Sequence, residues 1–278
     1  MQYQLASLLV IDMETTHKII FGDCLEKLKE IPDESVDLVF ADPPYNMSKT
    51  KGLGWKFSKH ITMQEAWDIF NKDEFFEFNL RWLMECFRIL KHGGSLWVSG
   101  SFHNIYQLGF IIQNIQDFKI NNSVVWFKPN AQPNITCRMF TESTEHLIWA
   151  SKNGNNKKWK FNYEDTKNEI SDDLNPKGKQ TRNVWSIPLT PPSEKLSGPH
   201  PTQKPTELLR RIILSCSDKG DLVLDPFAGS GTTNLMALQL ERNSIGIEKD
   251  PKYVDLIKKR LSKEANRKLF KEARVVTQ

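Results

Sequence analysis

The stretch LVLDPFAGSGTT, residues 222–233, decides how the rest of the chain is interpreted. Its first part, Leu222–Leu224, is a short apolar run typical of a buried strand, and a helical pattern begins at Thr232. Gly229 and Gly231 let the backbone pass close to a ligand, and the first amides of the helix are free to donate hydrogen bonds to it. A strand, a glycine-rich loop and a helix in this order indicate a site for a nucleoside cofactor.

Two acidic residues flank the loop and narrow the choice of cofactor. Glu248 ends the next predicted strand, about twenty residues beyond the loop, where a carboxylate can accept hydrogen bonds from two ribose hydroxyls. Asp225, directly before the loop, would repel a pyrophosphate but attract an ammonium group. Asn234 stands where the dinucleotide fingerprint has a third small residue. S-adenosylmethionine carries an α-ammonium and a sulfonium group and no phosphate, so the loop suits this cofactor better than NAD.

Strand-like and helix-like segments alternate along most of the chain. This alternation predicts an α/β fold: a doubly wound, mostly parallel, Rossmann-like sheet covered by helices on both faces, with ligands at the carboxyl ends of its strands. We expect His92, Gly93 and Gly94 to end a helix before the next strand begins. The predicted strands are 18–21, 36–41, 95–99, 123–127, 146–150, 222–224 and 244–247, and the predicted helices are 75–90, 206–216, 232–240 and one that begins at Pro251.

A second motif, Asp42-Pro43-Pro44-Tyr45, follows the predicted strand Val36–Ala41. The two prolines fix the backbone and remove two amide donors, so the carbonyl of Pro43 can face outward as an acceptor. The Asp42 carboxylate is a second acceptor, and the two together can bind both N–H groups of an exocyclic amine. Holding both would localise the nitrogen lone pair toward an electrophilic methyl group, while Tyr45 offers a flat face to an extruded base.

Length and composition suit one globular domain, residues 1–278, that carries an insert. The net charge of +4 permits a polyanionic partner without requiring one. The apolar run Leu5–Ile11 is too short and wrongly flanked for a signal peptide or a membrane span, so we expect a cytoplasmic protein without a membrane partner. Neither a zinc site nor a disulfide framework is expected, because no Cys-x-x-Cys pair occurs among Cys24, Cys86, Cys137 and Cys216.

The combination of motifs resembles the β-class S-adenosylmethionine-dependent DNA amino-methyltransferases of restriction–modification type, in which the catalytic motif precedes the cofactor motif. The resemblance runs from about Gly22 to Glu248. Gly22–Cys24 matches the family segment that contacts the adenine ring of the cofactor, and His200–Pro205 matches the segment whose backbone and Lys204 help to hold the methionine end. The segments Val125–Pro129 and Asn183–Pro188 also resemble the family.

This resemblance implies direct methyl transfer to the exocyclic amine of a flipped base. Aspartate at position 42 goes with adenine N6 in the family, where serine goes with cytosine N4. Methylation of cytosine C5 is excluded, because it needs a Cys nucleophile, usually after proline, and no cysteine here follows a proline. The predicted catalytic residues are Asp42, Pro43, Pro44 and Tyr45, and the predicted cofactor-binding residues are Asp23, Cys24, Lys204, Asp225, Pro226, Phe227, Ala228, Gly229, Ser230, Gly231, Thr232, Thr233 and Glu248.

Two basic segments are candidates for contact with double-stranded DNA. We expect residues 47–61 to form a mobile loop that contacts DNA beside the active centre. We expect residues 152–183, a long polar and basic insert, to recognise the target sequence. The predicted DNA-binding residues are Lys49, Lys51, Lys56 and Lys59 in the loop, and Lys157, Lys158, Trp159 and Lys160 in the insert.

Other functions remain open from the residues alone. A similar tetrad serves methylation of RNA or of a protein amide, and cytosine N4 is an alternative target on DNA. A dinucleotide-dependent oxidoreductase and a nucleic-acid-binding protein that has lost its activity are rivals from other classes, although the intact tetrad counts against both. The sequence also leaves open two further partners, a second copy in a homodimer and a cognate restriction endonuclease.

Overall fold

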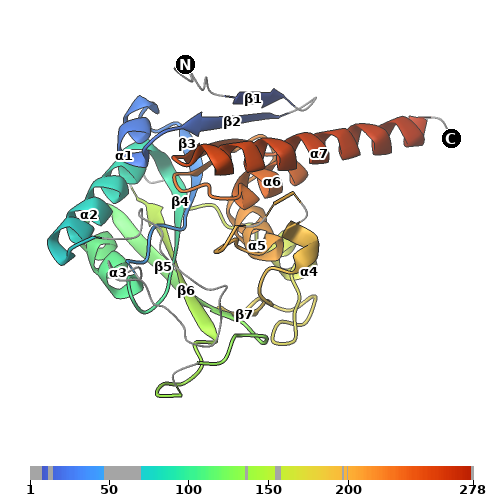
Figure 1. The fold of residues 1–278 in the computed structure, drawn as a ribbon. Coiled ribbons are helices and arrows are strands. Elements are labelled where there is room, and N and C mark those ends of the chain that lie inside the picture. Colours follow the sequence, from blue (N-terminus) through green and yellow to red (C-terminus); the bar gives the residue numbers. More distant parts are fainter. Residues whose placement is uncertain are drawn as a thin grey trace.

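The computed structural model describes residues 8–11, 15–46, 70–134, 137–153, 158–195, 197–198 and 200–276. Within these residues one nine-stranded sheet has the order β1-β2-β9-β8-β3-β4-β6-β5-β7 (Figure 1). Its strands are β1 (Leu8–Ile11), β2 (Thr16–Phe21), β3 (Val36–Ala41), β4 (Leu90–Gly100), β5 (Phe118–Phe127), β6 (Thr144–Lys152), β7 (Val184–Ser186), β8 (Leu222–Asp225) and β9 (Asn243–Glu248). The helices are α1 (Cys24–Lys27), α2 (Lys72–Ile89), α3 (Ile105–Asn114), α4 (Tyr163–Glu169), α5 (Thr206–Cys216), α6 (Thr232–Gln239) and α7 (Pro251–Val276), with short 3₁₀ helices at Leu28–Glu30 and Pro192–Lys195.

The sheet is mostly parallel, as predicted. β2, β9, β8, β3 and β4 run parallel to one another, and β7 runs parallel to β5. β1 is antiparallel to β2, and β6 is antiparallel to both β4 and β5. A parallel strand buries both of its faces and is therefore a continuous apolar run, which is why the bounds of β3 can be predicted from its residues.

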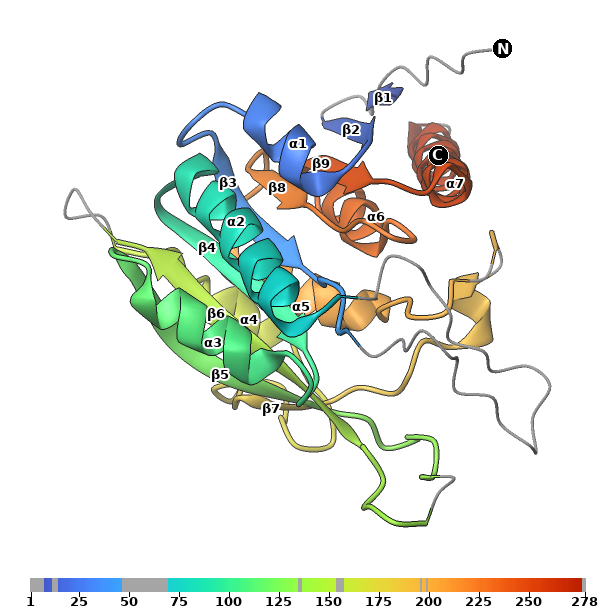
Figure 2. The same ribbon diagram turned by 60° about the vertical axis from the view of Figure 1, so that its left-hand side comes forward.

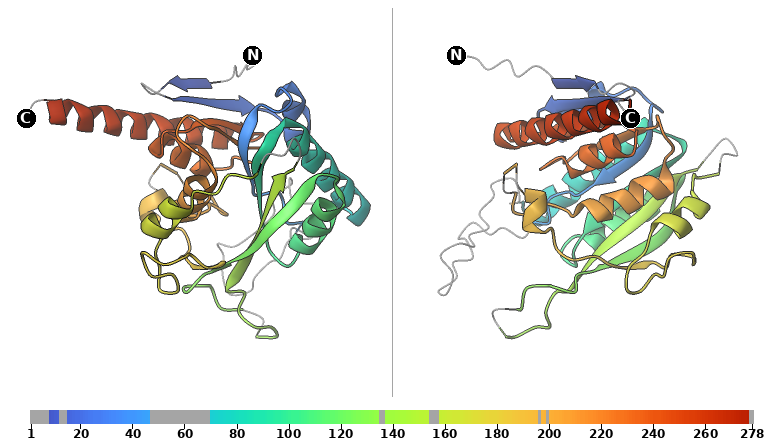
Figure 3. Two further views of the ribbon diagram at one scale, coloured as in Figure 1. Left: turned by 180° about the vertical axis from the view of Figure 1, so that it is seen from behind. Right: turned by 90° about the vertical axis from the view of Figure 1, so that its right-hand side faces the viewer.

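Helices cover both faces of the sheet, so the doubly wound prediction is confirmed (Figure 2). Successive residues of β3 point to opposite faces of the sheet. Val39 packs in one hydrophobic core with Trp82 of α2, and Phe40 packs in another with Leu209 of α5. α7 lies against α6 and β2 and extends past the sheet (Figure 3). Neither α7 nor another helix within the described ranges combines the length and the apolar character that crossing a membrane requires.

The stretch His92–Gly94 lies inside β4, so the prediction that these residues end the helix and that the strand starts at Ser95 is wrong. α2 ends and β4 begins at the next residue, so no loop separates them. The register between β3 and β4 shifts here, and a Cβ on Gly94 would lie 2.8 Å from the carbonyl oxygen of Lys91. Glycine is thus needed for a close backbone approach at an irregularity in the ladder.

Five parallel strands bring their carboxyl ends to one edge of the sheet. β2, β3, β4, β8 and β9 end there, and the strand directions in Figure 2 show this edge. The β5–β6 hairpin opens at the same edge, because Gly100 at the end of β4 pairs with His146 and Phe127 pairs with Thr144. Both predicted motifs and the loop between β5 and β6 therefore lie at this edge.

Candidate active site

A pocket lies at this carboxyl edge, between the two motifs. Asp42 and Pro44 of the catalytic motif line it together with Lys204. Every predicted cofactor-binding residue except Gly231 lines it as well. Sequence positions more than 200 residues apart thus meet at one site, at the place where a doubly wound sheet binds its ligands.

The glycine-rich loop is held by backbone hydrogen bonds to β9. The amide of Ala228 donates to the carbonyl of Ile247 at 2.9 Å, and the amide of Gly229 donates to Glu248 Oε2 at 2.8 Å. Gly231 has a φ of +73°, and a Cβ there would lie 2.7 Å from Ile257 of α7. Glycine is therefore required at position 231 by the left-handed conformation and by the packing of α7, and Gly231 does not line the pocket.

Asp225 presents a buried carboxylate to the pocket. Its oxygens accept hydrogen bonds from the amide of Phe227 at 2.9 Å and from the hydroxyl of Thr233. Burial raises the pKa of Asp225 to about 7, and the nearby charges of Asp42 and Glu248 add to the increase. A cation in the pocket would relieve this cost, so the site fits the ammonium and sulfonium groups of S-adenosylmethionine and disfavours a phosphate.

Glu248 and the segment Gly22–Cys24 form the other end of the pocket. Glu248 accepts hydrogen bonds from the amides of Gly229 and Asp250, each at 2.8 Å, and burial raises its pKa. Each carboxylate oxygen can accept more than one hydrogen bond, so ribose hydroxyls can still be bound. Burial raises the pKa of the Cys24 thiol to about 12, so Cys24 is a neutral contact and no nucleophile.

Aromatic side chains that the sequence analysis did not single out complete the wall. Phe70 and Phe78 stack with ring centroids 5.0 Å apart, and both line the pocket. His200 lies against Tyr253 with centroids 4.3 Å apart. Burial and neighbouring cations, Lys204 among them, lower the pKa of His200 to about 4, so its imidazole is neutral. These rings offer apolar faces to a flat heterocycle.

The catalytic motif ends β3 and enters a set of buried polar contacts. Lys204 Nζ lies 2.7 Å from Asp42 Oδ2, and the Tyr45 hydroxyl lies 2.8 Å from Asp42 Oδ1. The same hydroxyl lies 3.1 Å from Glu145 Oε2 and accepts a hydrogen bond from Lys204 at 3.2 Å. Lys204 was expected to hold the methionine end of the cofactor, which stays a prediction; in the structure its ammonium group pairs with Asp42 of the catalytic motif.

Glu145 and Lys128 belong to the site, and sequence reasoning missed both. Lys128 Nζ lies 3.3 Å from Glu145 Oε1, and Lys204 Nζ lies 3.4 Å from Glu145 Oε2. Two carboxylates and two ammonium groups therefore balance in one cluster. We call Asp42, Tyr45, Lys128, Glu145 and Lys204 the Asp42 cluster. The available signal was weak: Lys128 lies in the family-like segment Val125–Pro129, while Glu145 belongs to no motif.

The two carboxylates of the cluster differ in their electrostatics. Burial raises the pKa of Asp42, and the charge of Glu145 adds to the increase although Lys204 opposes it. Burial would also raise the pKa of Glu145, but Lys204 and Lys128 outweigh it and lower that pKa. Asp42 and Glu145 hold the pKa of Lys204 well above its ordinary value in spite of its burial. Glu145 is thus the permanent counterion, and Asp42 is the carboxylate poised to accept a proton or a donor.

A family model described as DNA methylase, of the N6 and N4 type, matches residues 36–259, which include both motifs. The chain belongs to this DNA methyltransferase family. M2.LlaDCHI, a Type II methyltransferase of Lactococcus lactis subsp. cremoris, is 43% identical over 249 residues, which cover 89% of this chain and 90% of the relative. M.HinfI, a Type II methyltransferase of Haemophilus influenzae, is 47% identical over 250 residues, which cover 87% of this chain and 67% of the relative.

Solved structures agree with the fold and the cofactor. M1.HpyAVI in complex with S-adenosylmethionine matches with a TM-score of 0.65 and 27% identity, over 88% of this chain and 98% of that chain. The PvuII cytosine-N4-specific DNA methyltransferase matches with a TM-score of 0.67 and 22% identity, over 88% and 86%, which shows the fold alone. This DNA methyltransferase therefore uses S-adenosylmethionine and is of restriction–modification type, and the rival dinucleotide-dependent oxidoreductase is excluded.

Of the predicted DNA contacts of the methyltransferase, those that the structure describes do not line this pocket. Lys49, Lys51, Lys56, Lys59 and Lys157 lie outside the described residues. Lys160 pairs with Asp218 at 2.7 Å and Asp221 at 2.6 Å, directly before β8 begins. Trp159 packs beside the core, and Lys119 Nζ lies 4.3 Å from its ring centroid. Lys158, Trp159 and Lys160 thus lie near the amino end of β8, whereas the pocket is at its carboxyl end.

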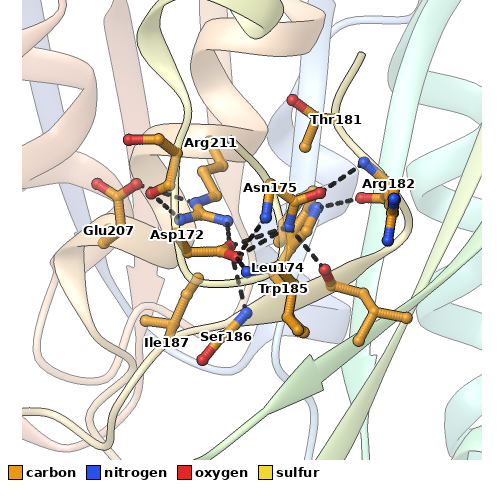
Figure 4. A network of polar contacts seen from close by, with 12 residues as sticks. Asp172, Leu174, Asn175, Thr181, Arg182, Trp185, Ser186, Ile187, Glu207 and Arg211 are labelled. Carbon is orange, nitrogen blue, oxygen red and sulfur yellow. Dashed lines mark hydrogen bonds and ion pairs between the residues drawn. The ribbon is translucent and has the colours of Figure 1, made fainter. Parts of the chain in front are cut away.

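Residues 172–175 in the later part of the insert are hydrogen-bonded to α5 and β7 (Figure 4). Asp172 accepts hydrogen bonds from Arg211 of α5 at 2.6 Å and from the amide of Ser186 in β7 at 3.2 Å. Asn175 donates to the carbonyl of Val184 at 2.8 Å. These contacts tie Asp172 and Asn175 to α5 and β7, while residues 176–180 beside them stay exposed.

Proposed function

We propose that this methyltransferase transfers a methyl group from S-adenosylmethionine to N6 of an adenine that is flipped out of double-stranded DNA at a specific sequence. The observation that carries the proposal is Asp42, a buried carboxylate with a raised pKa that lines the cofactor pocket at the end of β3. A carboxylate at this place suits the adenine amine, for which aspartate is usual in the family.

The residues of the site support direct, in-line transfer. Bound S-adenosylmethionine supplies the electrophilic methyl group on its sulfonium. Asp42 and the carbonyl of Pro43 accept the two N–H groups of the exocyclic amine and so direct its lone pair toward the methyl carbon. Transfer would join the methyl carbon to the amine nitrogen, leave the sulfur of the donor as a neutral thioether and place the positive charge on the amine. Asp42, whose pKa burial raises, then takes the excess proton from nitrogen.

The ion pair between Lys204 and Asp42 must weaken when the flipped adenine binds to Asp42. In the structure it pairs with Asp42 at 2.7 Å, and Glu145 lies 3.4 Å away as a second acceptor. Lys128 keeps Glu145 in place at 3.3 Å. Glu145 therefore lets Lys204 shift away from Asp42 without leaving an unpaired buried charge, which would be costly. Glu145 is a positioning residue, because it acts through Lys204 and Tyr45.

The chemical identity of the methylated base tests the proposal. Purified protein would be incubated with labelled S-adenosylmethionine and unmethylated double-stranded DNA, with RNA and protein as parallel acceptors. The DNA would be digested and its nucleosides separated by mass spectrometry. N6-methyladenine is expected; N4-methylcytosine as the product, or label only in RNA or protein, would overturn the proposal.

We also propose that the enzyme protects one short DNA sequence against a cognate restriction endonuclease. Its similarity to Type II methyltransferases supports this pairing. Sequencing of methylated bases in DNA from cells that express the chain would give the recognition sequence. Methylation spread over unrelated sequences would contradict site specificity. A homodimer and a role of residues 47–61 in DNA contact stay predictions, which sedimentation and substitution of the loop lysines would test.

A further inference from the structure

The β5–β6 hairpin projects from the sheet on the same side as the pocket (Figure 2). Lys128 directly follows β5 and Glu145 is the second residue of β6, so two members of the Asp42 cluster lie where the strands meet the loop. The amide of Lys128 donates to the carbonyl of Ser143 at 2.7 Å, and Asn130 accepts a hydrogen bond from the amide of Leu189 at 2.8 Å. The base of this loop is therefore fixed directly to the catalytic residues.

The outer part of the loop exposes apolar and cationic side chains together. Phe140 is 99% exposed and Met139 is 65% exposed, and Phe140 is the most exposed large hydrophobic residue of the described chain. Arg138, directly before them, is exposed too. An exposed phenylalanine beside an exposed methionine gains nothing for the fold, because neither ring nor thioether is removed from water. The side chains at this position need a partner to bury them.

We propose that Arg138, Met139 and Phe140 contact the DNA duplex around the flipped base, with Phe140 stacking where that base has left and Arg138 on the backbone. This inference rests on the proposed function and names the element that engages the duplex. A base that leaves its stack costs a few kcal/mol, and an apolar side chain inserted in the duplex offsets part of this cost. The hairpin can supply this side chain, because Lys128 and Glu145 at its foot belong to the Asp42 cluster, which receives the flipped adenine.

We assign DNA as the partner of this loop because the guanidinium of Arg138 and the ring of Phe140 lie together at the edge of the sheet where the substrate must enter. A second copy of this chain would also cover apolar side chains, and dimerisation is therefore one outcome of the test. The rival recognition segment, Lys158–Lys160, lies at the other end of β8, and Lys160 is already neutralised by Asp218 and Asp221. The hairpin therefore replaces the insert as the element expected to engage the target.

The experiment compares Phe140→Ala and Arg138→Ala with two controls in the full-length protein. Phe110→Ala removes a ring on α3 that is 59% exposed, and Lys158→Ala removes a charge of the insert. All four side chains are exposed, so the variants should fold. The probe is a duplex with the sequence methylated by the parent enzyme, carrying 2-aminopurine at the target base. DNA affinity, 2-aminopurine fluorescence, single-turnover methylation and S-adenosylmethionine affinity would be measured for each variant.

Phe140→Ala is expected to lower the flipping signal and the single-turnover rate about 5- to 150-fold, the range for loss of one base–aromatic stack. The loss should shrink on a duplex with an abasic site opposite the target, where flipping is already easy. Arg138→Ala should weaken DNA binding and flatten its salt dependence, and both controls should match the parent. Parent-like binding and flipping in both hairpin variants, or an equal loss in Phe110→Ala, would overturn the inference.

Failure of the proposed function is distinguishable from failure of this inference. If the parent methylated cytosine N4, the same variants would be compared on that base, and a defect confined to the hairpin variants would still support the contact. If the hairpin variants methylated the parent's adenine at the parent's rate, the hairpin contact would fail while the function stood. Dimer formation that Phe140→Ala abolishes, with DNA binding unchanged, would show that a second copy is the occupant.

Discussion

Two buried aspartates, Asp42 and Asp172, each pair with a buried cation, and their contacts lead to opposite electrostatics. Asp172 accepts hydrogen bonds from Arg211, from three backbone amides and from the amide side chain of Asn175. Burial alone would raise the pKa of Asp172, but Arg211 and the backbone amide of Leu174 lower it. Asp42 has Lys204 and Tyr45 as its partners, and burial raises its pKa.

The difference separates a structural carboxylate from a catalytic one. Asp172 ties the insert to α5 and β7, and its side chain is 7% exposed with both oxygens accepting several hydrogen bonds. Asp42 is 17% exposed, and the exposed part lines the pocket. A saturated carboxylate has no capacity left for a substrate, whereas one with few donors gains by binding one. The number of donors, rather than burial, tells the two roles apart.

Replacement of Asp42 should give the largest effect on the reaction. Asp42→Ala removes an acceptor of the amine and the proton acceptor together, and we expect methyl transfer to fall by about 10³-fold or more. Calorimetry should show S-adenosylmethionine binding that is largely intact, because Asp42 is not in the glycine-rich loop. An active Asp42→Ala enzyme would remove the basis of the mechanism.

Replacement of Asp172 should give the opposite pattern. Asp172→Ala removes one of the two carboxylates that pair with the buried Arg211 and leaves Glu207 at 2.9 Å. Loss of the hydrogen bonds that Asp172 accepts should cost about 1–3 kcal/mol. Chemical denaturation should show this decrease in the free energy of unfolding. The kcat and the KM for S-adenosylmethionine of the folded fraction should match the parent. A protein of parent-like stability that had lost methyl transfer would place Asp172 in catalysis and break the comparison.

Local motifs predicted the cofactor loop, the catalytic tetrad and the parallel strands, because each depends on residues close in sequence. Glu145 and Lys128 could not be placed in the same way. Their meeting with Asp42 depends on the antiparallel register of β5, β6 and β4, which no local pattern encodes. The helices α3 and α4 were missed as well. In the insert, composition predicted a basic and polar surface but could not show at which end of β8 it would lie.

Glu248 lies between the structural Asp172 and the catalytic Asp42: it accepts hydrogen bonds from two backbone amides, and it also lines the pocket. Glu248→Ala removes acceptors of the cofactor ribose and one anchor of Gly229. We expect the dissociation constant for S-adenosylmethionine to rise by about 5- to 150-fold, which corresponds to about 1–3 kcal/mol. Calorimetry would measure it, with Glu248→Gln as the matched control that keeps the shape. Unchanged affinity in both variants would assign Glu248 to the loop structure alone.

Glu145→Gln tests whether the counterion of Lys204 acts on Asp42. The substitution keeps the shape but leaves Lys204 with Asp42 as its remaining carboxylate, so we expect kcat to fall by about tenfold. Glu145 also raises the pKa of Asp42, so its loss should move the acidic limb of the kcat profile to lower pH. A purely structural role would reduce stability without moving that limb, and an unmoved limb would contradict the positioning role.

The smallest expected effect concerns Asp225, whose pKa of about 7 in the free protein makes cofactor binding sensitive to pH. A bound ammonium group favours the carboxylate and lowers that pKa, so binding must release a proton wherever Asp225 is protonated beforehand. The dissociation constant should therefore be flat above pH 8 and rise by about tenfold for each unit of pH below 7. Calorimetry in buffers of different ionisation enthalpy would count the proton directly.

Asp225→Asn, which keeps an oxygen acceptor for the amide of Phe227, should bind S-adenosylmethionine more weakly and lose the pH dependence of binding. An equal pH dependence in the parent and in Asp225→Asn would mean that another group titrates, and Asp225 would then join Asp172 as a carboxylate that only builds the fold.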